Sequence, residues 1–226
     1  MYKHFYRRNL PHQQPPGAIV FVTANLSGCL PKSVQLKLIE DGKLLKREYG
    51  SSPPDCPEMI AAWKRLFAYA DKQLDRSKER WYLKDDQVSQ VAVSALYKGV
   101  DMRRFVLHRY CIMPNHLHLL IEPLPQNVNL ESMDLQGDWP PRFFRPEVRE
   151  TWQKQCLLEE LQWAPLAPIM KAIKSVTALE INKKYKLTGA AWHRESFDHW
   201  VRNGEEYCRI IDYRPKSCES RIMSKA

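Results

Sequence analysis

The stretch that decides the fold is YCIMPNHLHLLIEP, residues 110–123. It places His116 and His118 one residue apart in an apolar run, directly after a turn-forming Pro-Asn pair. Side chains alternate along a β-strand, so both histidines point to one face while Leu117 and Leu119 point to the other. The two rings then lie roughly 6–7 Å apart along the strand, close enough to converge on one ion.

The segments around this stretch predict strands and helices in a mixed order. Residues 103–113 form a second strand next to 116–123, and the β-branched, apolar run at 18–26 forms a third. Apolar residues at helical spacing predict helices at 56–83, 85–99, 167–189 and from 204 onward, with Gly99 closing the second of them. We also expect a short helix and then a charged, mobile stretch over 32–50, and an extended segment at 191–203.

This order predicts an α+β protein in which helices pack on one antiparallel sheet. No internal repeat or long linker divides the chain, so residues 1–226 are expected to form a single domain. We interpret residues 45–90 as a helical insertion, residues 124–165 as mostly loop, and residues 214–226 as an atypical tail.

Composition indicates which kinds of binding partner and which cellular compartment to expect. The 35 lysines and arginines outnumber the 26 acidic residues, and the net charge of +9 favours a polyanionic partner such as nucleic acid. No apolar run reaches the roughly 20 residues that span a bilayer, and the N-terminus lacks the apolar core of a secretory signal. The six cysteines form no CxxC pair, which is typical of free thiols in a reducing cytoplasm.

Several kinds of site use a His-x-His pair on a strand. Neutral imidazoles bind divalent metals, and two of them leave coordination positions open for substrate oxygens. Hydrogen-bonded core histidines are the structural alternative. A histidine-triad hydrolase needs a further histidine at position 120, which is Leu, and a zinc hydrolase would recruit further ligands such as His108, His193 or His199.

Three separate segments give the chain a family resemblance. They are RRNLPHQQPPGAIVFVTANLSGCLP at 7–31, YCIMPNHLHLLIEP at 110–123, and MKAIKSVTALEINKKYKLTGAAWHRESFDHWVRNGEEYCRIIDY at 170–213. In their order and spacing the chain resembles the REP-associated tyrosine transposases, which belong to the single-tyrosine HUH transposases. The middle segment carries the motif of histidine, bulky hydrophobic residue and histidine.

The resemblance implies a ferredoxin-like HUH endonuclease domain that binds REP-type hairpins and cleaves single-stranded DNA. His116 and His118 would bind Mg²⁺ or Mn²⁺, and Tyr213 would attack the phosphodiester to give a 5′-phosphotyrosine intermediate. Such a protein would act in the bacterial cytoplasm, associated with the nucleoid, as a monomer or a homodimer. Tyr207 competes with Tyr213 for the role of nucleophile, and the resemblance favours Tyr213.

Basic side chains near the C-terminal third are the candidates for phosphate contacts. They are Lys171, Lys174, Lys183, Lys184 and Arg202. For each of them the alternative is an ordinary solvated helix face.

After Tyr213 the sequence departs from the family. Pro215 breaks a helix two residues later, and Ser217 stands where the family places a further polar metal ligand. Two rival functions therefore remain: a hairpin-binding protein that has lost cleavage, and an unrelated metal-dependent hydrolase that uses His116 and His118.

Overall fold

The computed structural model describes residues 5–7, 11–13, 15, 17–53, 56–126, 162 and 164–212. Its central feature is a four-stranded sheet in the order β4-β5-β3-β6, with every neighbouring pair antiparallel. The strands are β3 (Val20–Asn25), β4 (Phe105–Ile112), β5 (His116–Pro123) and β6 (Phe197–Trp200).

The connections make this sheet ferredoxin-like, as the family resemblance implied. Helices join β3 to β4, a tight turn joins β4 to β5, and a helix leads back to β6, so that β3 lies between β5 and β6. Two short strands, β1 (Phe5–Arg7) and β2 (Pro11–Gln13), form a separate hairpin that the sequence did not indicate.

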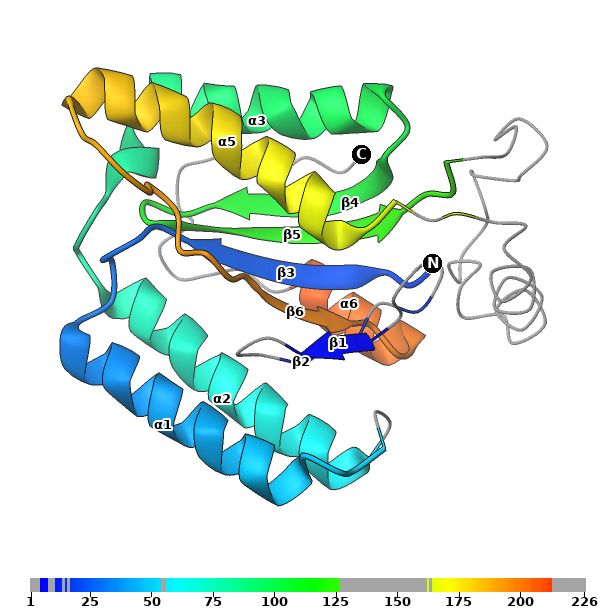
Figure 1. The fold of residues 1–226 in the computed structure, drawn as a ribbon. Coiled ribbons are helices and arrows are strands. Elements are labelled where there is room, and N and C mark those ends of the chain that lie inside the picture. The colour runs from blue at the N-terminus through cyan, green and yellow to red at the C-terminus, as the bar shows by residue number, and fades with distance from the viewer. Residues whose placement is uncertain are drawn as a thin grey trace.

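Helices cover both faces of the sheet (Figure 1). On one face lie α3 (Asp86–Asp101) and α5 (Leu166–Tyr185), which run side by side. On the other side lie the paired helices α1 (Lys32–Tyr49) and α2 (Pro57–Arg76). The last helix, α6 (Gly204–Asp212), packs beside β6, and a 3₁₀ turn, η1 (Tyr82–Lys84), leads from α2 into α3.

The residues of the two central strands, β3 and β5, alternate between the two faces of the sheet. Under α3 and α5 the sheet presents only apolar side chains from its two central strands: Val20, Val22, Ala24, Leu117, Leu119 and Ile121. The opposite face carries a small apolar cluster at one end, which includes Phe21 and Leu120. Its remaining buried positions are polar, and they are Thr23, Asn25, His116, His118 and Glu122. The opposite orientation of the histidines and leucines of β5, predicted from the sequence, is confirmed.

Four helices differ from their prediction. Helix α2 ends at Arg76 instead of residue 83, and α5 ends at Tyr185 instead of residue 189. Residues 32–49 form one continuous helix of 18 residues instead of a short helix and a mobile stretch. Helix α3 continues through Gly99 to Asp101, so this glycine does not close it. A Cβ on Gly99 would lie 2.5 Å from the ring of Phe105, so the glycine makes room for the first residue of β4.

Two further findings concern composition. Each of the four described cysteines, Cys29, Cys56, Cys111 and Cys208, is a free thiol. Among the described helices, none is both long enough and apolar enough to cross a membrane.

Candidate metal centre

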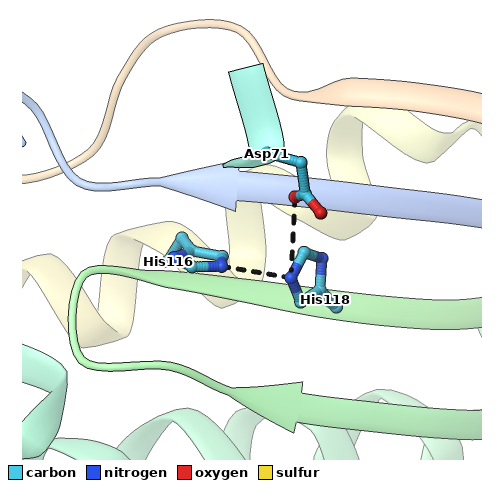
Figure 2. A group of neighbouring side chains, drawn as sticks. All are labelled: Asp71, His116 and His118. Carbon is cyan, nitrogen blue, oxygen red and sulfur yellow. Dashed lines mark hydrogen bonds and ion pairs between the residues drawn. The ribbon is translucent and has the colours of Figure 1, made fainter. Parts of the chain in front are cut away.

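Three side chains converge on the polar face of the sheet (Figure 2). The Nε2 atoms of His116 and His118 lie 3.1 Å apart, and Oδ1 of Asp71 lies 3.7 Å from Nε2 of His118. The donor atoms of the three residues all lie within 4.8 Å of one another. Among the described histidines, cysteines and acidic residues, this is the group with the geometry to hold a metal ion.

The sheet and helix α2 bring these groups together. His116 and His118 pair with Asn25 and Thr23 of β3 in the antiparallel register, which places them at the centre of the sheet. Helix α2 packs through a buried stripe that includes Leu66, Ala70 and Leu74. Asp71 lies beside that stripe, so packing of the helix carries its carboxylate over the two rings.

Asn115 fixes the orientation of His116. Its amide nitrogen donates to the backbone oxygens of Leu74 at 3.3 Å and Ser77 at 3.1 Å, at the end of α2. Its oxygen Oδ1 therefore faces Nδ1 of His116, at 2.7 Å, and accepts a hydrogen bond from the N–H group of that ring. With the proton held on Nδ1, Nε2 presents its lone pair toward His118.

The second ring, that of His118, is held by β3. Its Nδ1 lies 2.8 Å from the hydroxyl of Thr23, and the ring stacks on Phe21 at 5.5 Å between centroids. A hydroxyl both donates and accepts, so this partner suits either tautomer of His118. The Nε2 of this ring can therefore donate to His116 or, with its proton moved to Nδ1, act as a ligand.

Burial keeps both imidazoles neutral. Loss of hydration lowers the pKa of His118 to about 4 and lowers the pKa of His116 well below its ordinary value. The neutral form is the one that binds a metal. At neutral pH the site thus presents two uncharged nitrogen donors and one carboxylate.

These three donors fit a divalent ion. Two nitrogens bound at about 2.1 Å and at right angles lie about 3.0 Å apart, close to the 3.1 Å between the two Nε2 atoms. Three protein ligands leave further positions for substrate oxygens or water, as catalytic sites require.

A second carboxylate borders the cluster. Oδ1 of Asp75, one turn after Asp71 on α2, lies 3.8 Å from Nε2 of His116. Burial, and then the negative charge of Asp71, raise the pKa of Asp75. It therefore adds negative potential and a potential proton donor on the side of the site that faces α2.

An open cavity of about 540 Å³ lies beside the two aspartates. Helices α2 and α6 form its walls, together with Phe21 and His199 from the sheet. Basic side chains from both helices also line it, namely Lys64, Lys72 and Arg209. Acidic side chains line it too, namely Asp71, Asp75 and Glu206, and Lys64 pairs with Glu206. The cavity therefore offers both metal-binding carboxylates and cations that can contact a phosphate, chiefly Lys72 and Arg209.

The other candidate histidine ligands lie apart from the metal cluster. Nδ1 of His108 lies 3.1 Å from the Tyr207 hydroxyl, and its Nε2 lies 3.4 Å from Glu122. His199 pairs with Glu206 at 3.6 Å, and Nδ1 of His193 lies 3.2 Å from a backbone oxygen. Sequence spacing did not favour any of these three histidines as a metal ligand. In the structure each of them contacts different partners, and none belongs to the cluster of Asp71, His116 and His118.

Of the two tyrosines considered as the nucleophile, Tyr207 lies within the described part of the chain. Tyr207 is half-buried against His108, and burial raises the pKa of its hydroxyl, which makes that hydroxyl a poorer nucleophile at neutral pH. Tyr213 lies outside the described residues, as do Pro215, Ser217 and the rest of the tail.

The structure distributes the predicted phosphate-binding residues over several surfaces. Lys171 and Lys183 are exposed on α5, and Lys184 on the same helix donates to Asp85 at 2.7 Å. Lys174 donates to the backbone oxygen of His193 at 3.0 Å. Arg202 lies over the ring of Trp200 at 4.7 Å. Helix α5 covers the apolar face of the sheet, so its lysines do not approach the metal cluster directly.

The third donor of the cluster, Asp71, is the site residue that sequence reasoning missed. It lies in the region interpreted as an insertion, and no motif connects it with two histidines 45 positions later. The available signal was the i, i+4 pair Asp71 and Asp75 beside the apolar stripe of an otherwise ordinary amphipathic helix.

Comparison with known proteins gives one structural match. No family profile matches the sequence, and no curated protein matches it. The chain is similar to a solved structure of a REP-associated tyrosine transposase bound to a REP hairpin. The match has 15% sequence identity and a TM-score of 0.41, and it covers 94% of this chain and 70% of that chain. That structure comes from the family that the sequence resembles, and because both values are low, the function proposed below rests on the side chains of this chain.

Proposed function

We propose that this chain binds single-stranded hairpin DNA of the REP type and cleaves and rejoins it with a divalent metal and a tyrosine nucleophile. The observation that carries this proposal is the convergence of His116, His118 and Asp71 on the polar face of the sheet. Three neutral or anionic donors beside an open cavity that holds Lys72 and Arg209 suit an ion that shares its coordination positions with a phosphate.

Tyr213 is the proposed nucleophile. It follows directly after Asp212, the last residue of α6, and α6 packs on the same face of the sheet as the two histidines. Ile210 of this helix lines cavities together with both His118 and Asp71. The tyrosine is therefore one residue beyond a helix that already borders the metal cluster.

The proposed reaction exchanges one phosphodiester linkage for another, so the energy of the broken bond is kept in the covalent intermediate. The Tyr213 oxygen loses its proton and bonds to phosphorus, and the bond to the 3′-oxygen breaks. A 5′-phosphotyrosine and a free 3′-hydroxyl result, and attack by a second 3′-hydroxyl reverses the step without ATP. A bound divalent ion would withdraw electron density from the scissile phosphate and offset the charge that develops on it.

The donor set favours Mn²⁺ over Mg²⁺. Mg²⁺ prefers oxygen ligands, whereas imidazole nitrogens bind later first-row metals more tightly. With two imidazoles and one carboxylate, we expect Mn²⁺ to bind more tightly than Mg²⁺ and to support reaction at lower concentration.

The basic side chains supply the DNA contacts in this proposal. Lys72 and Arg209 would contact phosphates close to the metal cluster, within the open cavity. Lys171, Lys174, Lys183, Lys184 and Arg202 remain candidates for contacts farther along the strand.

A covalent-trapping assay tests the proposal. Full-length protein with Mn²⁺ is mixed with labelled single strands that carry the palindromes flanking its own gene, and the products are separated on a denaturing gel. We expect a protein–DNA adduct that is absent in Tyr213→Phe, in His116→Ala and in Asp71→Asn. The Tyr207→Phe variant is the matched control and should form the adduct, because its hydroxyl is bonded to His108 instead.

The second candidate function is hairpin binding without cleavage. Pro215 and Ser217 favour it, since they replace the helix continuation and the further polar ligand that the family places after the tyrosine. Tight hairpin binding with no adduct in any metal would establish this function. Metal-dependent hydrolysis that survives Tyr213→Phe and needs no DNA would instead indicate a hydrolase.

A further inference from the structure

A separate cavity of about 310 Å³ lies at the end of strand β3. Its walls come from α1, from Leu66 of α2 and from the segment 193–197 that leads into β6. Asn25 lines it, and Asn25 is the register partner of His116. A strand whose phosphate lies at the metal cluster would thus have a neighbouring nucleotide within reach of this cavity.

The lining combines apolar walls with a few polar groups. Leu30, Leu38, Ile39 and Phe197 provide flat or branched apolar surface, and Ile39 is 54% exposed at the helix surface. Two lysines of α1, Lys43 and Lys46, also line the cavity. Apolar walls with few polar groups and nearby positive charge are the features of a site for a base with its phosphate.

A buried carboxylate gives the cavity a polar recognition group. Glu195 is 8% exposed and lines the cavity beside His193. The ammonium group of Lys174 lies close enough for the negative charge of Glu195 to act on its pKa, and it donates to the backbone oxygen of His193. Asp198 acts on the same ammonium group, so Lys174 offsets part of the negative charge of both carboxylates. With that offset, Glu195 can accept a hydrogen bond from a neutral donor.

We propose that this cavity binds one unpaired nucleotide of the single strand beside the cleavage position, and this proposal rests on the function proposed above. The base lies between the apolar side chains of α1 and Phe197, and Lys43 and Lys46 meet the adjoining phosphates. Glu195 accepts hydrogen bonds from the base, which favours bases that carry an amino group over thymine.

The test is an abasic scan of strand binding. Full-length Tyr213→Phe protein with Mn²⁺ is titrated into fluorescent hairpin strands in which one abasic site is moved through the unpaired flank, and anisotropy gives each Kd. We expect one position at which loss of the base weakens binding about tenfold. Thymine at that position should also weaken binding, and Glu195→Gln should remove this discrimination.

Two substitutions on α1 provide the matched comparison. Ile39→Trp places a large side chain at the cavity and should weaken binding of the intact strand about tenfold, while abolishing the penalty of the abasic site. Leu44→Trp changes a residue of the same helix that is 55% exposed but does not line the cavity, and its binding should match that of the parent protein. Both sites are exposed, so both variants should fold.

The outcomes separate this proposal from the one on which it rests. Tight hairpin binding with an equal Kd at every abasic position, or an Ile39→Trp variant that binds like Leu44→Trp, overturns the nucleotide site alone. A chain that fails to bind any of the strands overturns both proposals.

Discussion

The two faces of the central sheet are formed by the same strands but have different roles. Under α3 and α5, alternate residues of β3 and β5 are all apolar and contribute to the main core. On the other face the same strands bury Thr23, Asn25, His116, His118 and Glu122. One face therefore stabilises the fold through the burial of apolar surface. Burying polar groups on the other face costs free energy, which offsets part of that stabilisation.

This difference shows that adjacent residues of β5 have separate roles, one in stability and one in the metal centre. Leu119 contacts the core, whereas His118, one position earlier, faces Thr23 and Asp71. Changes on the apolar face should alter stability without altering the chemistry, whereas changes at the metal ligands of the polar face should alter metal binding as well as any stability that the same residue provides. The predictions below test that separation.

Truncation on the apolar face should give the largest effect on stability. Leu119 is fully buried, so Leu119→Ala should lower the free energy of unfolding by about 3–5 kcal/mol. Urea denaturation followed by circular dichroism measures this loss, and Mn²⁺ affinity of the folded variant should stay within about twofold of the parent. Leu179→Ala, at a leucine that is 71% exposed, is the control and should cost less than about 0.5 kcal/mol.

Acid should destabilise the polar face of the metal-free protein. The pKa of His118 is about 4 in the folded state and near its ordinary 6.5 when unfolded, so between these values the unfolded chain binds more protons. Stability from this group is therefore complete above pH 6.5 and falls by about 3 kcal/mol as the pH drops to 4. Urea titrations across this range should show a shallower decline in His118→Gln, and equal slopes in both proteins would contradict the prediction.

Loss of the asparagine that orients His116 should weaken metal binding without removing a ligand. Asn115→Ala leaves Nδ1 of His116 without its acceptor, and we expect a 10- to 100-fold loss of Mn²⁺ affinity by calorimetry, about the effect of losing a partner that orients a ligand. Asn182→Ala removes a comparable bond from a side-chain amide to a backbone oxygen, that of Gly189, and should leave the affinity unchanged. If both variants bind Mn²⁺ like the parent, Asn115 does not orient the ligand.

The smallest effect is expected at Tyr207. Tyr207→Phe removes the hydroxyl that contacts His108 and should cost about 1 kcal/mol of stability. Its yield of DNA adduct should equal that of the parent when both are folded. If folded Tyr207→Phe forms no adduct, Tyr207 would replace Tyr213 as the proposed nucleophile. The proposed active site would then include His108 and Glu122.

The elements that the sequence predicted well are those whose signal is local. The apolar run with two histidines, the turn before it and the β-branched run at 18–26 all predict their strands, and strand alternation alone places His116 and His118 together. The order of strands and helices also predicts an α+β protein with one antiparallel sheet, and the family resemblance adds its ferredoxin-like topology.

The features that sequence reasoning missed depend on tertiary contacts. Asp71 reaches the histidines because α2 packs across the sheet, and nothing in the residues around it marks that contact. Gly99 resembles a helix terminator, yet its space is needed by Phe105, six residues beyond the expected end of the helix. The role of Asn115 likewise depends on backbone oxygens of α2 that lie about 40 positions earlier in the chain.

The bonds of Asn115 to the end of α2 have a consequence for the timing of activity during synthesis. Helix α2 leaves the ribosome before the histidine strand does, and it supplies both the Asp71 carboxylate and the backbone oxygens that orient Asn115. A chain in which α2 is not docked thus lacks one donor and the correct orientation of a second. A partly folded chain would bind metal poorly, so the complete metal centre, and with it the proposed cleavage, would appear only once the helix and the strand have come together.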